Sequence, residues 1–242
     1  RRSGETIKNP LRHQNPRRGY GGGIFHAVSR FPVVRKGRSR VIKAVLFDFD
    51  GVLTIEKTGS AAITKYIAKR CGLPAEQVRI CYRRYNQALL LGETTHAEIW
   101  PAFCEALGQK LDYQLLTDSF RATELDADML RLLRQLRTEY RIALVTDNKS
   151  DRIRTILECK NLDDLFDAVA VSAELGSGKT DRRIFDYVLE RLDLRPEECV
   201  FIDNAGKNLI VPGQMGIRTL LFDDGARDFP RFRAQLEAAL VR

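Results

Sequence analysis

Short apolar runs alternate with amphipathic stretches along most of the chain. The apolar runs predict β-strands at 41–50, 141–148, 168–174, 199–203 and 218–224. The amphipathic stretches predict helices over 126–140, 150–160, 182–194, 206–216 and about 228–241. Nearly continuous apolar strands that alternate with helices are typical of a parallel sheet with helices on both faces. The pattern therefore predicts an α/β fold built on a doubly wound parallel sheet.

Residues 59–123 follow a different pattern. They contain no strand candidate, and over 74–93 the apolar residues recur every three or four positions, as on one face of a helix. This segment is predicted to be an all-helical insertion after the first strand. The expected organisation is an α/β core at 41–58 and 124–242, a helical domain at 59–123 and an N-terminal extension at 1–40.

Composition limits the class of protein. The 242 residues are 44% apolar and 30% charged, as in globular proteins, and no apolar run approaches the ~18–20 residues of a membrane-spanning helix. The five cysteines form no CxxC pair, and the three histidines are not spaced as zinc ligands with them. We therefore expect free thiols in a reducing compartment, the cytoplasm, with no membrane as partner.

The positive charge is concentrated at the N-terminus. Residues 1–43 hold twelve Lys/Arg and one acid, Glu5, whereas the rest of the chain has a small excess of acids. The extension at 1–40 is therefore expected to be basic and disordered. A basic arm for nucleic acid or anionic lipid and an organelle transit peptide are the alternatives. Nucleic acid is not the expected partner, although the extension leaves it open.

Chemically active side chains follow the predicted strands. Since ligands bind at the carboxyl ends of parallel strands, these side chains are expected to meet at one edge of the sheet. The candidates are Asp48 and Asp50 after the first strand, Thr146, Asp147 and Asn148 after the second, Lys179 in the loop "GSGKT", and Asp203 and Asn204 after a later strand.

Asp48 and Asp203 together form a hard oxygen site suited to Mg²⁺. A metal ion and Lys179 would stabilise one carboxylate as a nucleophile and hold an anionic group against it. Asp50 can exchange protons with a leaving group, and Thr146 can donate to an anionic oxygen. A phosphate ester is the substrate that suits this arrangement.

Four stretches, "DFDGVLT", "LVTDN", "GSGKTDRRIF" and "FIDNAGKNL", resemble the four motifs of the haloacid dehalogenase-like (HAD) hydrolases, in order. The helical insertion resembles the cap of the phosphatase branch of that superfamily. The resemblance covers roughly 41–242 and implies a Rossmann-like core. It implies that Asp48 is the nucleophile and Asp50 the general acid/base, that Thr146 binds the phosphoryl group and that Lys179 neutralises charge.

The resemblance also implies a metal site made of Asp48, the backbone carbonyl of Asp50, Asp203 and the residue after it. Many family members have a second acid at that last position, where this chain has Asn204. Mg²⁺ affinity is then expected to be lower, or Asn208 and Asp223 to matter more. Asp147 and Asn148 are further candidates for substrate binding, although capping of the following helix is the simpler interpretation of Asp147.

The function that follows is a Mg²⁺-dependent phosphatase. It would hydrolyse a small phosphorylated metabolite, such as a sugar phosphate, through an aspartyl-phosphate. A phosphomutase and a dehalogenase are alternatives, and the presence of Asp50 counts against the dehalogenase. A non-catalytic binding module on the same fold is the alternative from another class. The sequence leaves the oligomeric state open.

Overall fold

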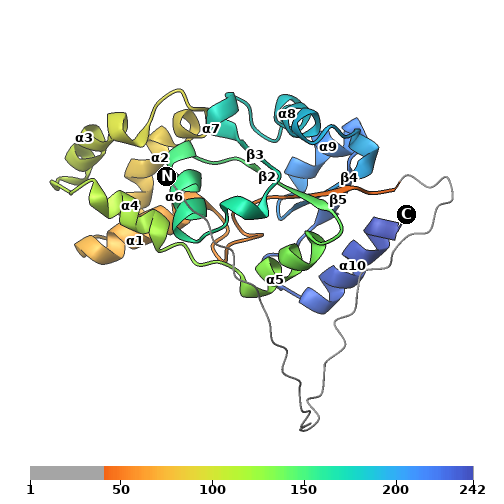
Figure 1. The fold of residues 1–242 in the computed structure, drawn as a ribbon. Coiled ribbons are helices and arrows are strands. Elements are labelled where there is room, and N and C mark those ends of the chain that lie inside the picture. Colours follow the sequence, from red (N-terminus) through yellow and green to blue (C-terminus); the bar gives the residue numbers. More distant parts are fainter. Residues whose placement is uncertain (1–40, 242) are drawn as a thin grey trace, which may run out of the picture. The chain divides into compact units, whose positions relative to one another are not determined.

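The computed structural model describes residues 41–241, and its centre is a five-stranded parallel sheet in the order β3-β2-β1-β4-β5 (Figure 1). The strands are β1 (Ala44–Phe47), β2 (Arg141–Thr146), β3 (Ala168–Val171), β4 (Cys199–Asp203) and β5 (Arg218–Leu221). The central strand β1 pairs with β2 on one side and β4 on the other, with Phe47 level with Leu144 and Ile202. The predicted doubly wound α/β sheet is therefore confirmed.

Alternate residues of β1 point to opposite faces of the sheet, and both faces are buried. Val45 and Phe47 join the apolar cluster that includes residues of α5 (Ala127–Leu136), α6 (Ser150–Cys159) and α10 (Phe229–Val241). Ala44 and Leu46 join the cluster on the other face, with α8 (Arg183–Leu192) and α9 (Ile210–Met215). Figure 1 shows α8 and α9 above the sheet and α5 and α10 below it. Burial on both faces explains why the strand sequences are almost wholly apolar.

Residues 59–123, all of which the structure describes, contain four helices and no strand. The helices are α1 (Gly59–Cys71), α2 (Ala75–Leu91), α3 (His96–Leu107) and α4 (Gln114–Arg121). The two connections to the sheet meet at an antiparallel bridge between Thr54 and Leu125, which closes the segment at its base. We call residues 59–123 the helical segment; its status as a separate domain stays a prediction.

Most predicted strands and helices extend a few residues beyond the observed ones, and two of them also differ in the kind of element observed. The strand predicted at 168–174 ends at Val171, because Ser172 begins the short helix α7 (Ser172–Leu175). The helix predicted at 206–216 is a 3₁₀ turn at Gly206–Leu209 followed by α9. Further 3₁₀ turns lie at Asp163–Leu165 and Pro196–Glu198.

The other predictions from composition can be compared with the described residues only. All five cysteines are free, as expected. Between residues 41 and 241 no helix is both long and apolar enough to cross a membrane. The predicted basic, disordered extension at 1–40 lies outside the described residues.

Three helices of the helical segment end at a glycine in the left-handed conformation, and one of these glycines touches the core. A Cβ added at Gly92, where φ is +69°, would lie 2.0 Å from the carbonyl oxygen of Ala173. At Gly72, where φ is +66°, it would meet nothing within 4 Å. Gly92 therefore permits both the helix end and a close approach of two backbones, whereas Gly72 permits only the helix end.

We expect Gly92→Ala to destabilise the protein more than Gly72→Ala. The left-handed conformation alone should cost Gly72→Ala about 1 kcal/mol. Gly92→Ala must also displace the Ala173 backbone, which should add about 1–3 kcal/mol. Urea unfolding of both variants measures the difference. Equal losses would show that the contact with Ala173 relaxes without cost.

Candidate active site

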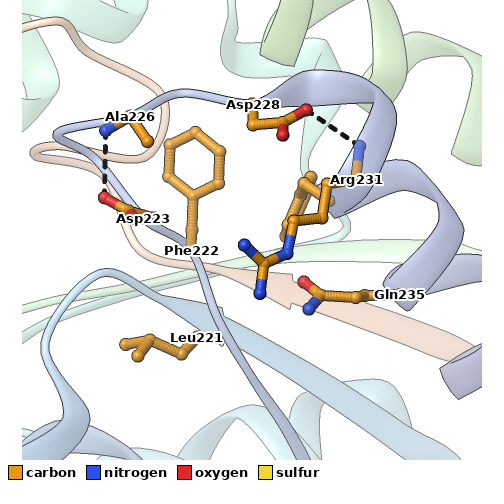
Figure 2. A pocket seen from close by; sticks show the side chains of 8 residues that line it. Leu221, Phe222, Asp223, Ala226, Asp228, Arg231 and Gln235 are labelled. Atoms are coloured by element: carbon orange, nitrogen blue, oxygen red, sulfur yellow. Dashed lines mark hydrogen bonds between the residues drawn. The ribbon is translucent and has the colours of Figure 1, made fainter.

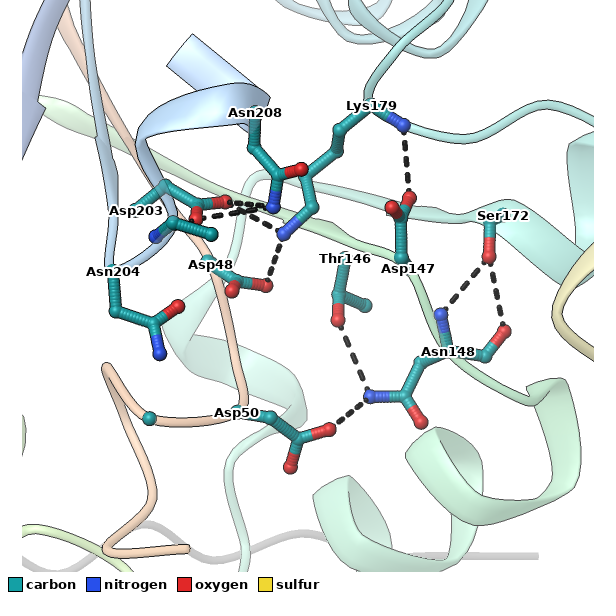
Figure 3. Close-up of polar contacts among 12 residues, drawn as sticks. Asp48, Asp50, Thr146, Asp147, Asn148, Ser172, Lys179, Asp203, Asn204 and Asn208 are labelled. Carbon is teal, nitrogen blue, oxygen red and sulfur yellow. Dashed lines mark hydrogen bonds and ion pairs between the residues drawn. The ribbon is translucent and has the colours of Figure 1, made fainter. Parts of the chain in front are cut away.

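The candidate site forms where β1, β2 and β4 end, and its centre is a buried ammonium group. The Nζ atom of Lys179 lies 2.8 Å from Oδ1 of Asp48 and 2.6 Å from Oδ2 of Asp203 (Figure 3). The side chains of all three residues are at most 7% exposed. Three distant segments of the chain thus bring opposite charges into direct contact, as the sequence predicted.

Burial and pairing act in opposite directions on these charges. Burial raises the pKa of Asp48 to about 7, with the negative charge of Asp203 adding to the rise and Lys179 opposing it. Burial disfavours the charged form of Lys179, but the carboxylates of Asp48 and Asp203 outweigh it, so that the pKa of Lys179 is raised. The lysine is therefore held as a cation, which favours the ionised form of Asp48.

Asp203 is held by hydrogen bonds from Asn208 and Ala205, and the side-chain oxygen of Asn208 has no hydrogen-bond partner. The Nδ2 atom of Asn208 donates to both oxygens of Asp203, at 3.1 and 3.2 Å, and the backbone N–H of Ala205 donates at 2.7 Å. Oδ1 of Asn208 is buried and has no hydrogen-bond partner. Two carboxylates and an unsatisfied amide oxygen form a donor set that suits a hard cation such as Mg²⁺. Among the described residues, no cluster of three or more His, Cys, Asp or Glu side chains is arranged to hold a metal.

Asn204, at the position where many family members have an acid, is oriented by another carboxylate. Its Nδ2 atom donates to Oδ2 of Asp224 at 3.1 Å. Figure 3 shows the amide oxygen turned toward Asp48. Asp224 is therefore the acid that contacts Asn204. Asp223, the expected residue, instead accepts hydrogen bonds from the backbone N–H groups of the turn that follows it.

Gly51 allows this arrangement. At φ +79° it adopts a conformation that L-residues avoid, and an added Cβ would lie 2.2 Å from Nδ2 of Asn204. The loop that contains Gly51 is also held from the far end of the chain, since Arg227 donates to the carbonyl oxygens of Gly51 and Thr54 at 3.3 Å. The loop after β1 is therefore fixed on two sides.

Asp50 has a different environment from Asp48. Arg152 binds both of its carboxylate oxygens, at 2.8 and 3.0 Å, and Nδ2 of Asn148 donates to it at 2.8 Å. Figure 3 shows the Asp50 carboxylate directed at Asn148 and away from Asp48. The same Nδ2 atom lies 3.3 Å from the hydroxyl of Thr146. The side chain of Asn148 is therefore occupied within the protein.

Arg152 was not among the residues predicted from the sequence, and its side chain is completely buried. The guanidinium lies 5.8 Å from the centre of the Phe49 ring, and Gly59 makes room for it, since a Cβ there would lie 2.5 Å from its Nη1 atom. Arg152 is one turn before Ile156 on the buried side of α6. An arginine on an apolar stripe was the feature that could have revealed it.

Asp147 does not cap the following helix, so that interpretation is wrong. Oδ1 of Asp147 accepts from the backbone N–H of Lys179 at 2.8 Å, whereas α6 begins after Lys149. Asp147 therefore fixes the loop that carries the catalytic candidate Lys179. Its further role in substrate binding stays a prediction, as does that of Asn148.

All the candidate residues except Asn148 and Asp203 line a hollow of about 360 Å³. The core contributes Asp48, Asp50, Thr146, Lys179 and Asn204, and the helical segment contributes Ser60, Asn86 and Leu90. A second hollow of about 280 Å³ lies beside α10 (Figure 2). Its carboxylates, Asp223 and Asp228, accept hydrogen bonds from nearby backbone N–H groups and are not paired with a buried lysine. The first hollow is therefore the candidate active site.

Comparison with known proteins agrees with the geometry. The sequence model of the haloacid dehalogenase-like hydrolases matches residues 42–210. The chain belongs to this family of hydrolases. This match confirms the motif resemblance. The predicted fold class is confirmed as well, because solved structures of HAD enzymes are similar to the structure of this chain.

Two curated relatives and one solved structure show what the chain is similar to. The chain is 25% identical over 208 residues to bifunctional epoxide hydrolase 2 of Rattus norvegicus, covering 76% of this chain but only 37% of that protein. It is 24% identical over 199 residues to D-ribitol-5-phosphate phosphatase of Bacteroides thetaiotaomicron, covering 77% and 94%. A HAD family enzyme of the same bacterium, crystallised as an Asp-to-Ala mutant with magnesium and inorganic phosphate, has a TM-score of 0.61 at 22% identity, covering 76% and 95%. That likeness shows the fold.

The pair between Arg152 and Asp50 predicts a large effect on stability. Arg152→Met should cost about 3–5 kcal/mol, because it leaves the buried Asp50 carboxylate without its partner. The double variant Asp50→Asn/Arg152→Met should recover part of the loss, since it removes both charges. Urea unfolding of the wild type, both single variants and the double variant measures the coupling. A loss below about 1 kcal/mol for Arg152→Met would show an ion pair no stronger than an exposed one.

Proposed function

We propose that the protein is a Mg²⁺-dependent phosphatase that hydrolyses a small phosphomonoester through an aspartyl-phosphate on Asp48. The observation that carries this proposal is the contact of Asp48 with Lys179, at a hollow large enough for a small metabolite. Lys179 engages Oδ1 of Asp48, which leaves Oδ2 to attack phosphorus. The similarity to D-ribitol-5-phosphate phosphatase supports a phosphorylated polyol or sugar as substrate.

Thr146 and Lys179 would bind the phosphoryl oxygens. The hydroxyl oxygen of Thr146 is the acceptor in its contact with Asn148, so its proton remains available for a phosphoryl oxygen. Lys179 adds a fixed positive charge beside the attacking carboxylate. Because both groups are held in place before the substrate binds, they stabilise developing charge without a reorganisation cost.

Asp48, Asp203, the backbone carbonyl of Asp50 and the amide oxygens of Asn204 and Asn208 would hold Mg²⁺. The free acceptor of Asn208 supports this assignment. When bound, Mg²⁺ would neutralise the charge of the phosphoryl group and keep Asp48 ionised. The magnesium in the similar HAD enzyme structure is consistent with the choice of metal.

Asp50 would act as general acid and then as general base. In the described structure it is bound to Arg152 and Asn148, so acid–base catalysis requires its carboxylate to rotate toward the leaving oxygen. A dehalogenase would not need this group. A phosphomutase would transfer the phosphoryl group from Asp48 to a substrate hydroxyl, and product analysis separates the two reactions.

The helical segment would act as the cap of the phosphatase branch. It supplies Ser60, Asn86 and Leu90 to the lining of the hollow that Asp48 also lines. The leaving group of the substrate would therefore contact this segment, while the phosphoryl group contacts the core. The free cysteines support the cytoplasm as the compartment in which the enzyme works.

Asp48→Asn should lower phosphatase turnover by at least about three orders of magnitude, because the amide cannot form the aspartyl-phosphate. Phosphate release from p-nitrophenyl phosphate with Mg²⁺ is the measurement. Asp181→Asn, which changes a partly exposed acid outside the hollow, is the control and should keep wild-type turnover. Circular dichroism checks that both variants fold. Near-normal turnover by folded Asp48→Asn would contradict the assignment of the nucleophile.

The contact between Asn204 and Asp224 predicts how Mg²⁺ affinity can be raised. Asn204→Asp alone would place two carboxylates side by side, and their repulsion should offset any gain. The exchange Asn204→Asp/Asp224→Asn keeps the hydrogen bond and moves the charge toward the metal, so Mg²⁺ should bind up to about tenfold more tightly. The measurements are activity against Mg²⁺ concentration and the shift of melting temperature by Mg²⁺ alone. Identical values for the exchanged and wild-type proteins would show that residue 204 does not face the metal.

A further inference from the structure

A second buried lysine lies in the hollow, and the catalytic scheme does not use it. Lys149 is 3% exposed and follows the β2 loop at the start of α6. Its Nζ atom donates to Oγ of Ser60 at 2.9 Å and to Oδ1 of Asn86 at 2.8 Å, and it lies 5.6 Å from the centre of the Tyr82 ring. All three neighbours belong to the helical segment. Lys149 therefore lies between the core and the segment that would contact the leaving group.

The partners of Lys149 are unusual for a buried cation, because both hydrogen-bonded groups are neutral. Burial lowers the pKa of Lys149 to about 7, and the positive charge of Arg152 adds to this effect. Asp50 and Asp151 oppose the decrease, but neither accepts a hydrogen bond from Lys149. A buried ammonium without an anionic partner is costly, so an anion that binds beside it would be stabilised strongly.

Lys149 also lines the hollow that Asp48, the proposed nucleophile, lines. Lys149, Ser60 and Asn86 line the same hollow as Asp48, Thr146 and Lys179. Lys179 is already neutralised by Asp48 and Asp203, and Arg152 by Asp50. Among the buried cations described at this site, Lys149 alone is not paired with a carboxylate. A small phosphomonoester whose phosphoryl group lies at Asp48 would extend its other end toward this lysine.

We propose that Lys149, Ser60 and Asn86 form a subsite for a second anionic group, a carboxylate or a phosphate, on the alcohol part of the substrate. The inference rests on the proposed phosphatase function and narrows its substrate class. The anion would accept from Lys149 and from the amide nitrogen of Asn86. The hydroxyl of Ser60 donates to Oδ1 of Asn86 at 2.6 Å and would hold that amide in position. The charge of Lys149 would then distinguish such substrates from neutral polyol phosphates.

Matched substrates test the subsite. 3-Phosphoglycerate and glycerol 3-phosphate differ by a carboxylate in place of a hydroxymethyl group, and propane-1,3-diol bisphosphate and 3-hydroxypropyl phosphate differ by a second phosphate. The wild type should prefer the anionic member of at least one pair, and that pair identifies the anion. Lys149→Met should raise KM for the preferred substrate about 10- to 100-fold, the range for a hydrogen bond to a charged group. It should leave kcat and the kinetics of the neutral member nearly unchanged.

Two further variants separate binding from general effects. Lys149→Arg keeps the charge and should retain most of the preference. Lys207→Met removes an exposed lysine that also lines the hollow, and should leave the preference unchanged. An equal loss for both members of a pair in folded Lys149→Met, or no preference in the wild type, would overturn the subsite. Wild-type turnover of p-nitrophenyl phosphate, which has no second anion, tests the phosphatase function separately.

Discussion

The site depends on one buried ammonium group that two buried carboxylates share. Asp48, Lys179 and Asp203 come from different segments at the same edge of the sheet, and none of them could be buried alone without a large desolvation cost. The parallel sheet solves this problem because it brings β1 and β4 into register, so that their carboxyl ends lie side by side. The fold and the charge cluster thus require each other.

The charges at this edge do not balance, and the imbalance has a chemical use. Within the buried cluster itself, Asp48 and Asp203 share one cation, Lys179, which leaves an excess of one negative charge there. A divalent cation beside Asp48 and Asp203 would reverse the sign and attract a phosphoryl dianion. The carboxylates of Asp48 and Asp203 are the oxygen donors that such an ion would use. Many family members have an acid where this chain has Asn204, so the excess of negative charge is smaller here. The site would still attract both a divalent cation and a phosphoryl dianion without that second acid.

The sequence predicted the parts of the molecule that local pattern determines. Apolar runs located the strands, and the acids that follow them located the edge of the sheet where Asp48 and Asp203 meet. It did not predict Arg152, Lys149 or Asp224, because their partners lie far away in the sequence and an arginine or lysine on a helix is usually exposed. The error between Asp223 and Asp224 has the same origin, since the turn after β5 determines which of two adjacent carboxylates points toward Asn204.

The boundary between the core and the helical segment contains two polar contacts that catalysis would have to change. Arg152 binds Asp50 next to Gly59. Lys149, three residues before Arg152, donates to Ser60 of α1 and Asn86 of α2. A substrate with two anionic ends would compete for both places, because its leaving oxygen requires Asp50 and its second anion requires Lys149. Binding at the two ends would then be coupled through the helical segment. A substrate that lacks the second anion would leave Lys149 attached to Ser60 and Asn86, and the position of the segment would stay that of the unliganded protein.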